Sequence, residues 1–196
     1  MPALRFEDLL QDPDRERDGD RWGAEGRPVL LLNEAGADRS AWWPVAARLA
    51  DEHAVAVLDL PPSRSLTARA ETLAAYVAAM GTRAPVIAGH GPAGLVASLF
   101  AARYLAHAVV SIEQRLDEPH HDPDTERALQ EITAGPRRLQ CRYLAIFAAA
   151  PQPGYEAWLQ QRLPAAACTT YRTEGDHPHL SDPVRFTDDI RAIAAS

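Results

Sequence analysis

Near-continuous apolar runs alternate with helix-like segments along this chain, and that alternation limits the folds it can adopt. The run PVLLL at 28–32 and the run PVIAG at 85–89 are typical of strands buried on both faces of a parallel sheet. Segments with apolar residues at helical spacing, such as 66–80, follow these runs. The alternation predicts an α/β fold with a doubly wound, mainly parallel sheet. We expect a single domain over 1–196, with an irregular N-terminal segment at 1–27.

The carboxyl ends of the predicted strands are the expected place for a ligand, because ligands of such sheets usually bind there. In this sequence those ends fall at Asn33–Gly36, Leu60–Pro62, His90–Pro92, Glu113–Gln114, Ala148–Pro151 and Gly175–His179. The sequence therefore predicts that the residues of a functional site come from these stretches.

The composition excludes several classes of function. A net charge of −7 argues against a general nucleic-acid binder, which needs a basic face to displace counterions. No stretch reaches the roughly 18 apolar residues of a membrane span, and the acidic N-terminus lacks the apolar core of a secretory signal. Cys141 and Cys168 lack metal-ligand spacing and are expected to be reduced thiols. We expect a cytoplasmic protein that acts on a small-molecule substrate, with no nucleic acid, membrane, metal or cofactor.

The stretch PVIAGHGPAGLVASLF at 85–100 is typical of a short strand, a tight glycine-rich turn and a helix of small residues. This is the shape of a nucleophile elbow, in which a G-x-S-x-G turn lifts a serine above the sheet. Gly91, which has no side chain, stands where the serine of that motif belongs. Pro92 follows it and has no backbone N–H, so it cannot provide the oxyanion donor expected from that position. The pattern predicts the turn without the chemistry that normally uses it.

Three segments together resemble the α/β-hydrolase superfamily over roughly residues 27–196. Residues 28–50 are similar to that family's strand, oxyanion turn and first helix, with Asn33 and Glu34 inside a turn that is normally His-Gly-x-Gly. Residues 84–104 resemble the elbow, and residues 174–195 resemble the loop and helix that present the catalytic histidine. The resemblance implies an α/β-hydrolase-like core, here with a minimal lid or none.

The resemblance also indicates candidate catalytic residues. Alignment on the Pro-His-Leu run at 178–180 puts Asp176 at the family's histidine position, and a shift of one residue puts His177 there. The usual acid position, at 149–151, holds no carboxylate, but some relatives, such as the haloalkane dehalogenases, place the acid one strand earlier, where this chain has Glu113. The resemblance thus implies a pair in which Glu113 orients His177 as a general base. Asp176 either joins that chemistry or bonds loop amides, and His179 matches a structural position.

Glu34 stands in a slot that the resemblance assigns to a glycine beside the oxyanion hole. A carboxylate there would repel a developing oxyanion, whereas a partly desolvated carboxyl suits a general acid or base. The alternative is that Glu34 faces solvent or pairs with Arg39 or another arginine. The candidate substrate-binding residues around it are Asn33, Trp43, His90 and Gly91. In the family, the histidine at the place of His90 mostly packs behind the elbow.

The segment 115–138 lies where relatives insert a helical lid, and here it holds a polar loop and one short helix. We interpret it as a vestigial cap region, which would leave a cleft open or closed by a second copy or a pathway partner. The loop contains His120, His121 and Asp122, which could ligate zinc, but adjacent histidines rarely converge alone. Capping of the following helix by Asp124 or Thr125 is the better interpretation.

Two functions fit the sequence. The first is a general acid–base enzyme without a covalent intermediate, acting on a small organic molecule in a biosynthetic or tailoring pathway as a cyclase, dehydratase, isomerase or water-adding enzyme. The second is a catalytically inactive member of the fold that serves as a binding or protein-interaction module. They are distinguished by whether Glu34, Glu113 and His177 converge beside Gly91.

Overall fold

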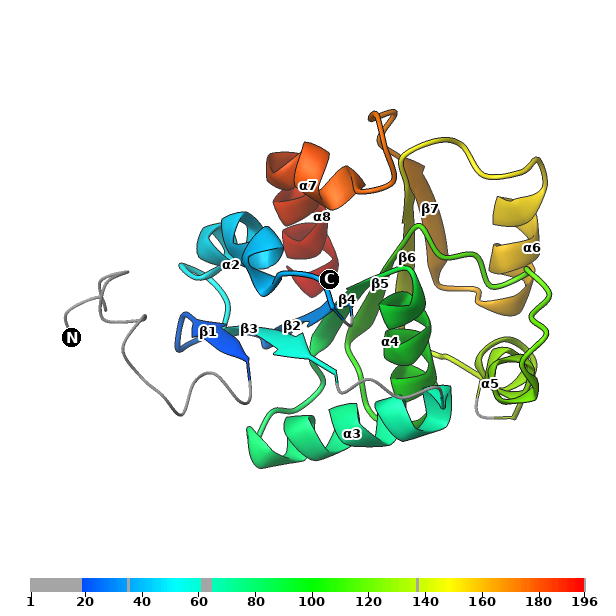
Figure 1. The fold of residues 1–196 in the computed structure, drawn as a ribbon, viewed down its shortest axis with the longest axis horizontal. Coiled ribbons are helices and arrows are strands. Elements are labelled where there is room, and N and C mark those ends of the chain that lie inside the picture. The colour runs from blue at the N-terminus through cyan, green and yellow to red at the C-terminus, as the bar shows by residue number, and fades with distance from the viewer. Residues whose placement is uncertain (1–18, 35, 61–64, 137, 196) are drawn as a thin grey trace.

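The computed structural model describes residues 19–34, 36–60, 65–136 and 138–195, and it places a central sheet between two layers of helices (Figure 1). Within these residues, seven strands form one sheet in the order β1-β3-β2-β4-β5-β6-β7. The edge strand β1 pairs antiparallel with β3, and the other neighbouring pairs are parallel. The predicted doubly wound, mainly parallel sheet is confirmed.

The elements follow one another as strand and helix along most of the described chain. The strands are β1 (Asp20–Trp22), β2 (Val29–Asn33), β3 (Val55–Asp59), β4 (Val86–His90), β5 (Ala108–Ile112), β6 (Arg142–Phe147) and β7 (Ala166–Thr170). The helices are the 3-10 helix η2 (Arg39–Trp42), α2 (Trp43–Leu49), α3 (Leu66–Ala79), α4 (Pro92–Arg103), α5 (Pro123–Thr133), α6 (Tyr155–Arg162), α7 (Pro178–Ser181) and α8 (Pro183–Ala195).

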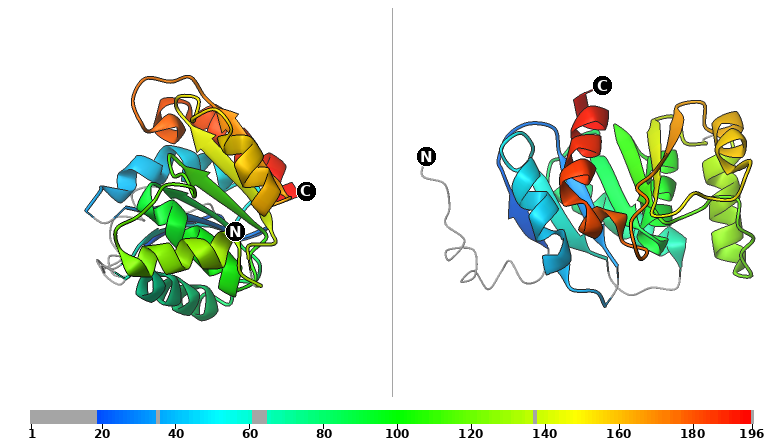
Figure 2. Two further views of the ribbon diagram at one scale, coloured as in Figure 1. Left: turned by 90° about the vertical axis from the view of Figure 1, so that its right-hand side faces the viewer. Right: turned by 90° about the horizontal axis from the view of Figure 1, so that it is seen from above.

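Strand side chains alternate between two apolar cores, one on each face of the sheet. On β2, Leu30 and Leu32 face the core that α3, α4, α5 and α6 cover, whereas Val29 and Leu31 face the core under α2 and α8. The turned views in Figure 2 show the same two helical layers from the side and from above. Because both faces are covered, the strands need apolar residues at every position, and this explains the continuous runs in the sequence.

The segment that we expected to be irregular contains a strand. Residues 20–22 form β1, whose register pairs Asp20 with Val57 and Trp22 with Val55. A strand of this length gives almost no periodic signal, and β1 forms because the outer edge of β3 offers unpaired backbone groups. Residues 1–18 lie outside the described part of the chain.

The segment 115–138 contains a crossover helix between β5 and β6. Its helix α5 packs against α3 and α4 on one face of the sheet, and the interpretation of this segment as a vestigial cap stays a prediction. The predicted caps of this helix were wrong: Asp122 caps it, with its carboxylate accepting from the backbone N–H of Thr125 at 3.0 Å. Asp124 reaches across to Ser65 and Thr67 at the start of α3.

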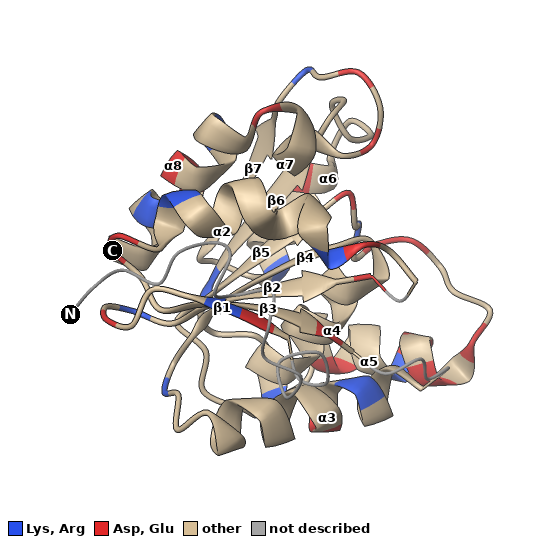
Figure 3. Ribbon diagram, turned by 60° about the vertical axis from the view of Figure 1, so that its left-hand side comes forward, with Lys and Arg blue, Asp and Glu red and all other residues tan. Residues whose placement is uncertain are grey.

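Several of the described helices carry charges of both signs. α3, α5 and α8 each carry both acidic and basic side chains, as Figure 3 shows. This mixture does not form the one-sided basic stripe that a nucleic-acid binder needs. In the described part of the chain, no helix combines the length and the apolar character needed to cross a membrane.

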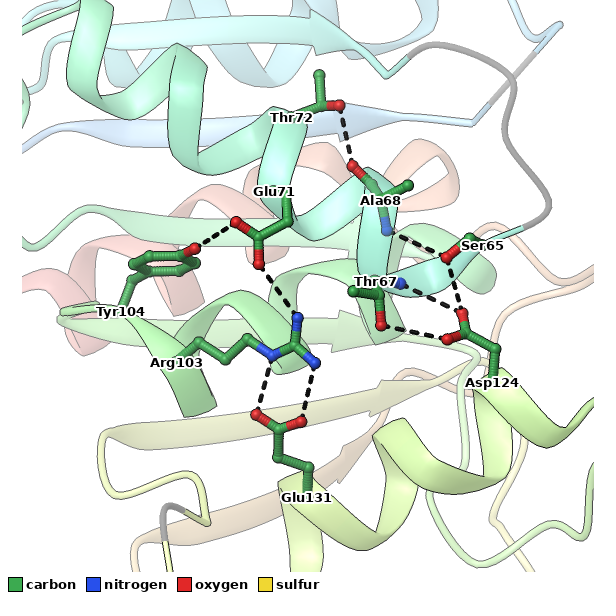
Figure 4. Close-up of polar contacts among 9 residues, drawn as sticks. All are labelled: Ser65, Thr67, Ala68, Glu71, Thr72, Arg103, Tyr104, Asp124 and Glu131. Carbon is green, nitrogen blue, oxygen red and sulfur yellow. Dashed lines mark hydrogen bonds and ion pairs between the residues drawn. The ribbon is translucent and has the colours of Figure 1, made fainter.

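Polar contacts join the helices α3, α4 and α5, which lie on one face of the sheet (Figure 4). Arg103 on α4 donates from Nε and Nη2 to the two carboxylate oxygens of Glu131 on α5, both at 2.9 Å. It also donates from Nη1 to Glu71 on α3 at 3.2 Å, and Glu71 accepts a second bond from Tyr104 at 2.5 Å. The paired bond to Glu131 is the stronger one, because a guanidinium and a carboxylate match as two parallel hydrogen bonds.

Glu131→Gln is expected to lower the free energy of unfolding by about 1.5 kcal/mol, because it leaves Arg103 with a neutral amide in a half-buried place. Glu71→Gln is the matched control, since the Glu71 side chain is 52% exposed and its removal is expected to cost less than about 0.5 kcal/mol. Denaturant titration of both variants measures the difference. Equal losses would show that the paired geometry carries no extra stability.

Candidate functional site

Gly91 forms the turn between β4 and α4, as the sequence predicted. It adopts φ +51° and ψ −128°, a conformation that favours glycine, and it is the N-cap residue of α4. Its N–H donates to the carbonyl of Ile112 at 2.8 Å, which fastens the turn to β5. A Cβ built on Gly91 would have Glu34 Oε1 as its nearest neighbour, at 3.9 Å. The turn therefore has room for a side chain and holds none.

Two further glycines let α4 lie directly against the sheet. A Cβ on Gly89 would come within 2.6 Å of the backbone of Ala93, and a Cβ on Gly94 within 2.6 Å of Ser111 Oγ. The backbone contact at Gly89 leaves no room for a larger residue, whereas a larger residue at Gly94 would require the Ser111 hydroxyl to move. The frame of an elbow is thus complete. Pro92 follows at the first helical position and provides no N–H there.

Glu34 and His90 face each other beside Gly91. The distance from Glu34 Oε2 to His90 Nδ1 is 3.7 Å, and the Glu34 side chain is 43% exposed whereas His90 is 13% exposed. His90 Nε2 donates to the backbone carbonyl of Asp176 at 2.7 Å, so its Nδ1 is the nitrogen that meets Glu34. Arg39, the partner that we considered for Glu34, pairs with Asp59 at 3.1 Å instead.

The loop before α7 brings Asp176 and His177 to the same place. His177 Nδ1 donates to Asp176 Oδ1 at 2.5 Å, and this hydrogen bond is the main cause that lowers the pKa of the Asp176 carboxyl. The His177 ring stacks on the ring of His90, with centroids 4.3 Å apart and an 18° angle between the planes. With Nδ1 bonded, Nε2 of His177 is the nitrogen left to accept a proton.

His179 has a structural place behind these residues. It is 3% exposed and stacks on the buried Trp42, with ring centroids 4.4 Å apart. Burial is the main cause that lowers the pKa of His179 to about 3, and the nearby His90 and His177 add to the shift. His179 is therefore a neutral ring in the core at ordinary pH.

Glu113 and His177 are not hydrogen-bonded to each other, although we predicted them as a pair. The Glu113 carboxylate accepts from the backbone N–H of Ala148 at the end of β6, and His177 is bonded to Asp176. Glu113 holds a positive φ of +53° at the end of β5, which aims its side chain toward the neighbouring strand end. Asp176, not Glu113, is the carboxylate that orients His177 in this structure, and a catalytic role for Glu113 stays a prediction.

Two candidate substrate-binding residues have other partners. Asn33 is buried and donates both amide hydrogens, to the carbonyl of Ala37 at 2.7 Å and to Asp59 Oδ1 at 2.8 Å. The indole N–H of Trp43 donates to Asp20 on β1 at 2.8 Å. Asn33 thus organises the turn after β2, and the contact described for Trp43 points toward the sheet edge. Their roles in substrate binding stay predictions that these contacts do not support.

Sequence reasoning missed Arg69, on the second turn of α3. Its Nε and Nη2 are buried and have no hydrogen-bond partner among the described residues. Burial lowers the pKa of this guanidinium, and the charge of Glu34 opposes that shift. The sequence signal that could have indicated Arg69 is its place a few residues after the predicted strand end at Leu60–Pro62. Our prediction considered only the strand ends themselves and so did not include it. Across the described residues, no three His, Cys, Asp or Glu side chains are grouped to hold a metal ion.

Comparisons with solved structures identify the fold that carries this site. No protein-family model matches the sequence, and no curated protein does. An esterase from a marine microorganism superposes with a TM-score of 0.73 at 14% identity, over 88% of this chain and 97% of that chain. AqDC, described as recognising and cleaving the ring of the Pseudomonas quinolone signal, superposes with a TM-score of 0.72 at 15% identity, over 90% of this chain and 95% of that chain. A thermophilic esterase from Thermogutta terrifontis superposes with a TM-score of 0.67 at 21% identity, over 88% of this chain and 90% of that chain.

The chain has the α/β-hydrolase fold. Identities this low show the fold alone, so activity has to be inferred from the site. Within that fold, the elbow turn of this chain carries no hydroxyl or thiol, since its residues are Gly89, His90, Gly91, Pro92 and Ala93.

Proposed function

We propose that this protein is a general acid–base enzyme that acts on a small organic molecule without a covalent intermediate. The observation that carries the proposal is the meeting of two carboxylate–imidazole pairs beside Gly91, namely Glu34 with His90 and Asp176 with His177. We take Gly91 to stand where other members of the fold hold a nucleophile.

Acyl transfer does not fit this site. It needs a nucleophile that a base activates and donors that hold an oxyanion. Gly91 offers no nucleophile, and Pro92 offers no N–H at the start of α4. The nearest atom to the place of a nucleophile is a carboxylate oxygen of Glu34, at 3.9 Å from the built Cβ, where negative charge would oppose an oxyanion.

His177 is the proposed base. Asp176 fixes its tautomer by accepting from Nδ1, and this leaves Nε2 to take a proton from the substrate. The stack on His90 fixes the plane of the ring, and the bond from His90 to the Asp176 carbonyl fixes the backbone that carries it. The side chain of His177 is 47% exposed, so a substrate can reach it.

The Glu34–His90 pair is the proposed acid. His90 Nε2 donates to a carbonyl, and its Nδ1 faces a carboxylate oxygen of Glu34. We assign delivery of a proton to the Glu34 carboxyl of this pair, while His177 removes another proton from the substrate. Cyclisation, dehydration, isomerisation and water addition can each proceed by such a paired transfer, without an acyl intermediate. The ring-cleaving protein AqDC shares the fold, which supports the view that the fold hosts more than esterases.

The test starts from an untargeted search, because the substrate is unknown. The purified protein is incubated with a small-molecule extract, and mass spectrometry identifies any compound that it consumes. His177→Gln is expected to slow that conversion by about 100-fold, the usual contribution of general base catalysis. His121→Gln is the matched control, since His121 is exposed on the loop before α5. Unchanged turnover in His177→Gln would remove the base assignment. No conversion in any extract would favour a binding or interaction module.

A further inference from the structure

The guanidinium of Arg69 presents two buried hydrogen-bond donors that the described residues leave unpaired. These donors are Nε and Nη2, which lie on one edge of the planar group. A buried cationic donor without a partner is costly, and native proteins satisfy such groups with an ordered water, an ion or a ligand. Arg69 therefore needs a partner that the described side chains do not provide.

The same edge holds a carboxylate in two other arginines of this chain. Arg103 donates from Nε and Nη2 to Glu131, as Figure 4 shows, and Arg115 donates from the same two nitrogens to Asp117 at 2.9 and 2.8 Å. In both cases the two parallel bonds match the two oxygens of a carboxylate. Arg69 offers an identical edge, and the comparison indicates what kind of group it is shaped to bind.

The position of Arg69 places this edge near the candidate site. α3 starts at the edge of the sheet where the parallel strands end, and Arg69 lies on its second turn. α3 packs along α4, whose N-terminus is Gly91. Glu34, whose charge acts on Arg69, has its carboxylate next to Gly91. Arg69, Glu34 and the side-chain-free turn thus share one region.

We propose that Arg69 binds a carboxylate group of the substrate through Nε and Nη2. This inference rests on the proposed function, because it names the class of molecule that the acid–base site acts on: a small organic acid. The negative charge of Glu34 acts on the same guanidinium, so a bound carboxylate would meet repulsion from Glu34. A planar monoanion suits the two-donor edge better than a phosphate, which brings more negative charge toward Glu34.

A titration with simple anions tests the assignment directly. Protein with 15N-labelled arginine is titrated at constant ionic strength with acetate, succinate, benzoate and inorganic phosphate, and the Nε–Hε resonances are followed by NMR. We expect one or more of the carboxylates to shift the Arg69 resonance saturably. Arg69→Lys keeps the charge but loses the two-donor edge, and it should weaken that binding roughly tenfold or more. Arg191→Lys, on the outer helix α8, is the matched control and should leave the affinity within about twofold.

Further variants sharpen the outcome. Glu34→Gln removes a negative charge that acts on Arg69 and should strengthen carboxylate binding. His177→Gln should bind as the wild type does, because binding does not require turnover. The inference is overturned if none of the carboxylates moves the Arg69 resonance, which would indicate an ordered water as its partner, or if phosphate binds as tightly as the best carboxylate. Carboxylate binding without any turnover would leave Arg69 assigned and reject the proposed enzyme. If Arg69→Lys turns over the substrate with an unchanged KM, the assignment of Arg69 to carboxylate binding is rejected, whereas the proposed acid–base activity stands.

Discussion

Gly89→Ala is expected to lower the free energy of unfolding by about 3 kcal/mol or more, which is a large loss for one methyl group. A Cβ at this position would lie 2.6 Å from the backbone carbon and oxygen of Ala93 and 2.8 Å from the backbone nitrogen of Gly94. A flexible side chain could move aside, but these atoms belong to the first turn of α4. The helix would have to shift away from the sheet and disturb the apolar core between them.

Denaturant titration of Gly89→Ala against the wild type measures this loss. Gly91→Ala is the matched control, because its Cβ meets only Glu34 Oε1 at 3.9 Å and the change introduces backbone strain without a clash. That strain is expected to cost roughly 1 to 2 kcal/mol. If Gly89→Ala proved as stable as the wild type, α4 would not lie as close to the sheet as the structure places it.

Acid is expected to destabilise the protein through His179. The ordinary histidine pKa is 6.5, and that of folded His179 is about 3. Between these two pKa values His179 binds a proton in the unfolded chain but not in the folded chain. The free energy of unfolding therefore falls as the pH falls below about 6.5, and the stabilising contribution of the neutral ring is fully present above that pH. From about pH 7.5 to about pH 5, this residue should remove about 2 kcal/mol from the free energy of unfolding.

His179→Gln isolates this contribution, because glutamine does not titrate. The variant is expected to be less stable than the wild type at neutral pH, since it loses the stack on Trp42. The decisive quantity is the change in the free energy of unfolding between about pH 7.5 and about pH 5. This change should be smaller in the variant by about 2 kcal/mol. His121→Gln, which removes an exposed histidine, should follow the wild-type curve. Parallel curves for His179→Gln and the wild type would show that His179 takes up a proton in the folded state.

The fold could be predicted because its signals are local and repeated. Continuous apolar runs and helical spacing predicted the order of the strands and helices. The glycine spacing predicted the turn at Gly91. The strand β1 was missed because three residues carry no periodicity. The cap of α5 was assigned to the wrong residue because 122, 124 and 125 all hold side chains that favour that position.

The strand ends named from the sequence hold Glu34, His90 and His177, which lie near one another, but the sequence did not predict their pairing, and their roles stay predictions. Glu34, His90 and His177 follow different strands, and a parallel sheet brings such ends to one edge. The choice of Asp176 over Glu113 as the partner of His177 depends on the conformation of one loop residue, which a sequence pattern does not record. Arg69 was missed because the predicted strand ends stop before it, and because a position inside a helix does not indicate that a guanidinium will be buried without a described partner.

The backbone of Gly91 has a consequence for how this sequence can change over time. Any other residue at this position has to adopt φ +51° and would carry the strain of roughly 1 to 2 kcal/mol expected for Gly91→Ala. A side chain is therefore kept here only while selection rewards what it does. Without that reward, glycine is favoured because it carries no strain here, and any other residue has to offset its strain with a benefit. A serine that arose at this position by chance, without a function, would therefore tend to be replaced by glycine again.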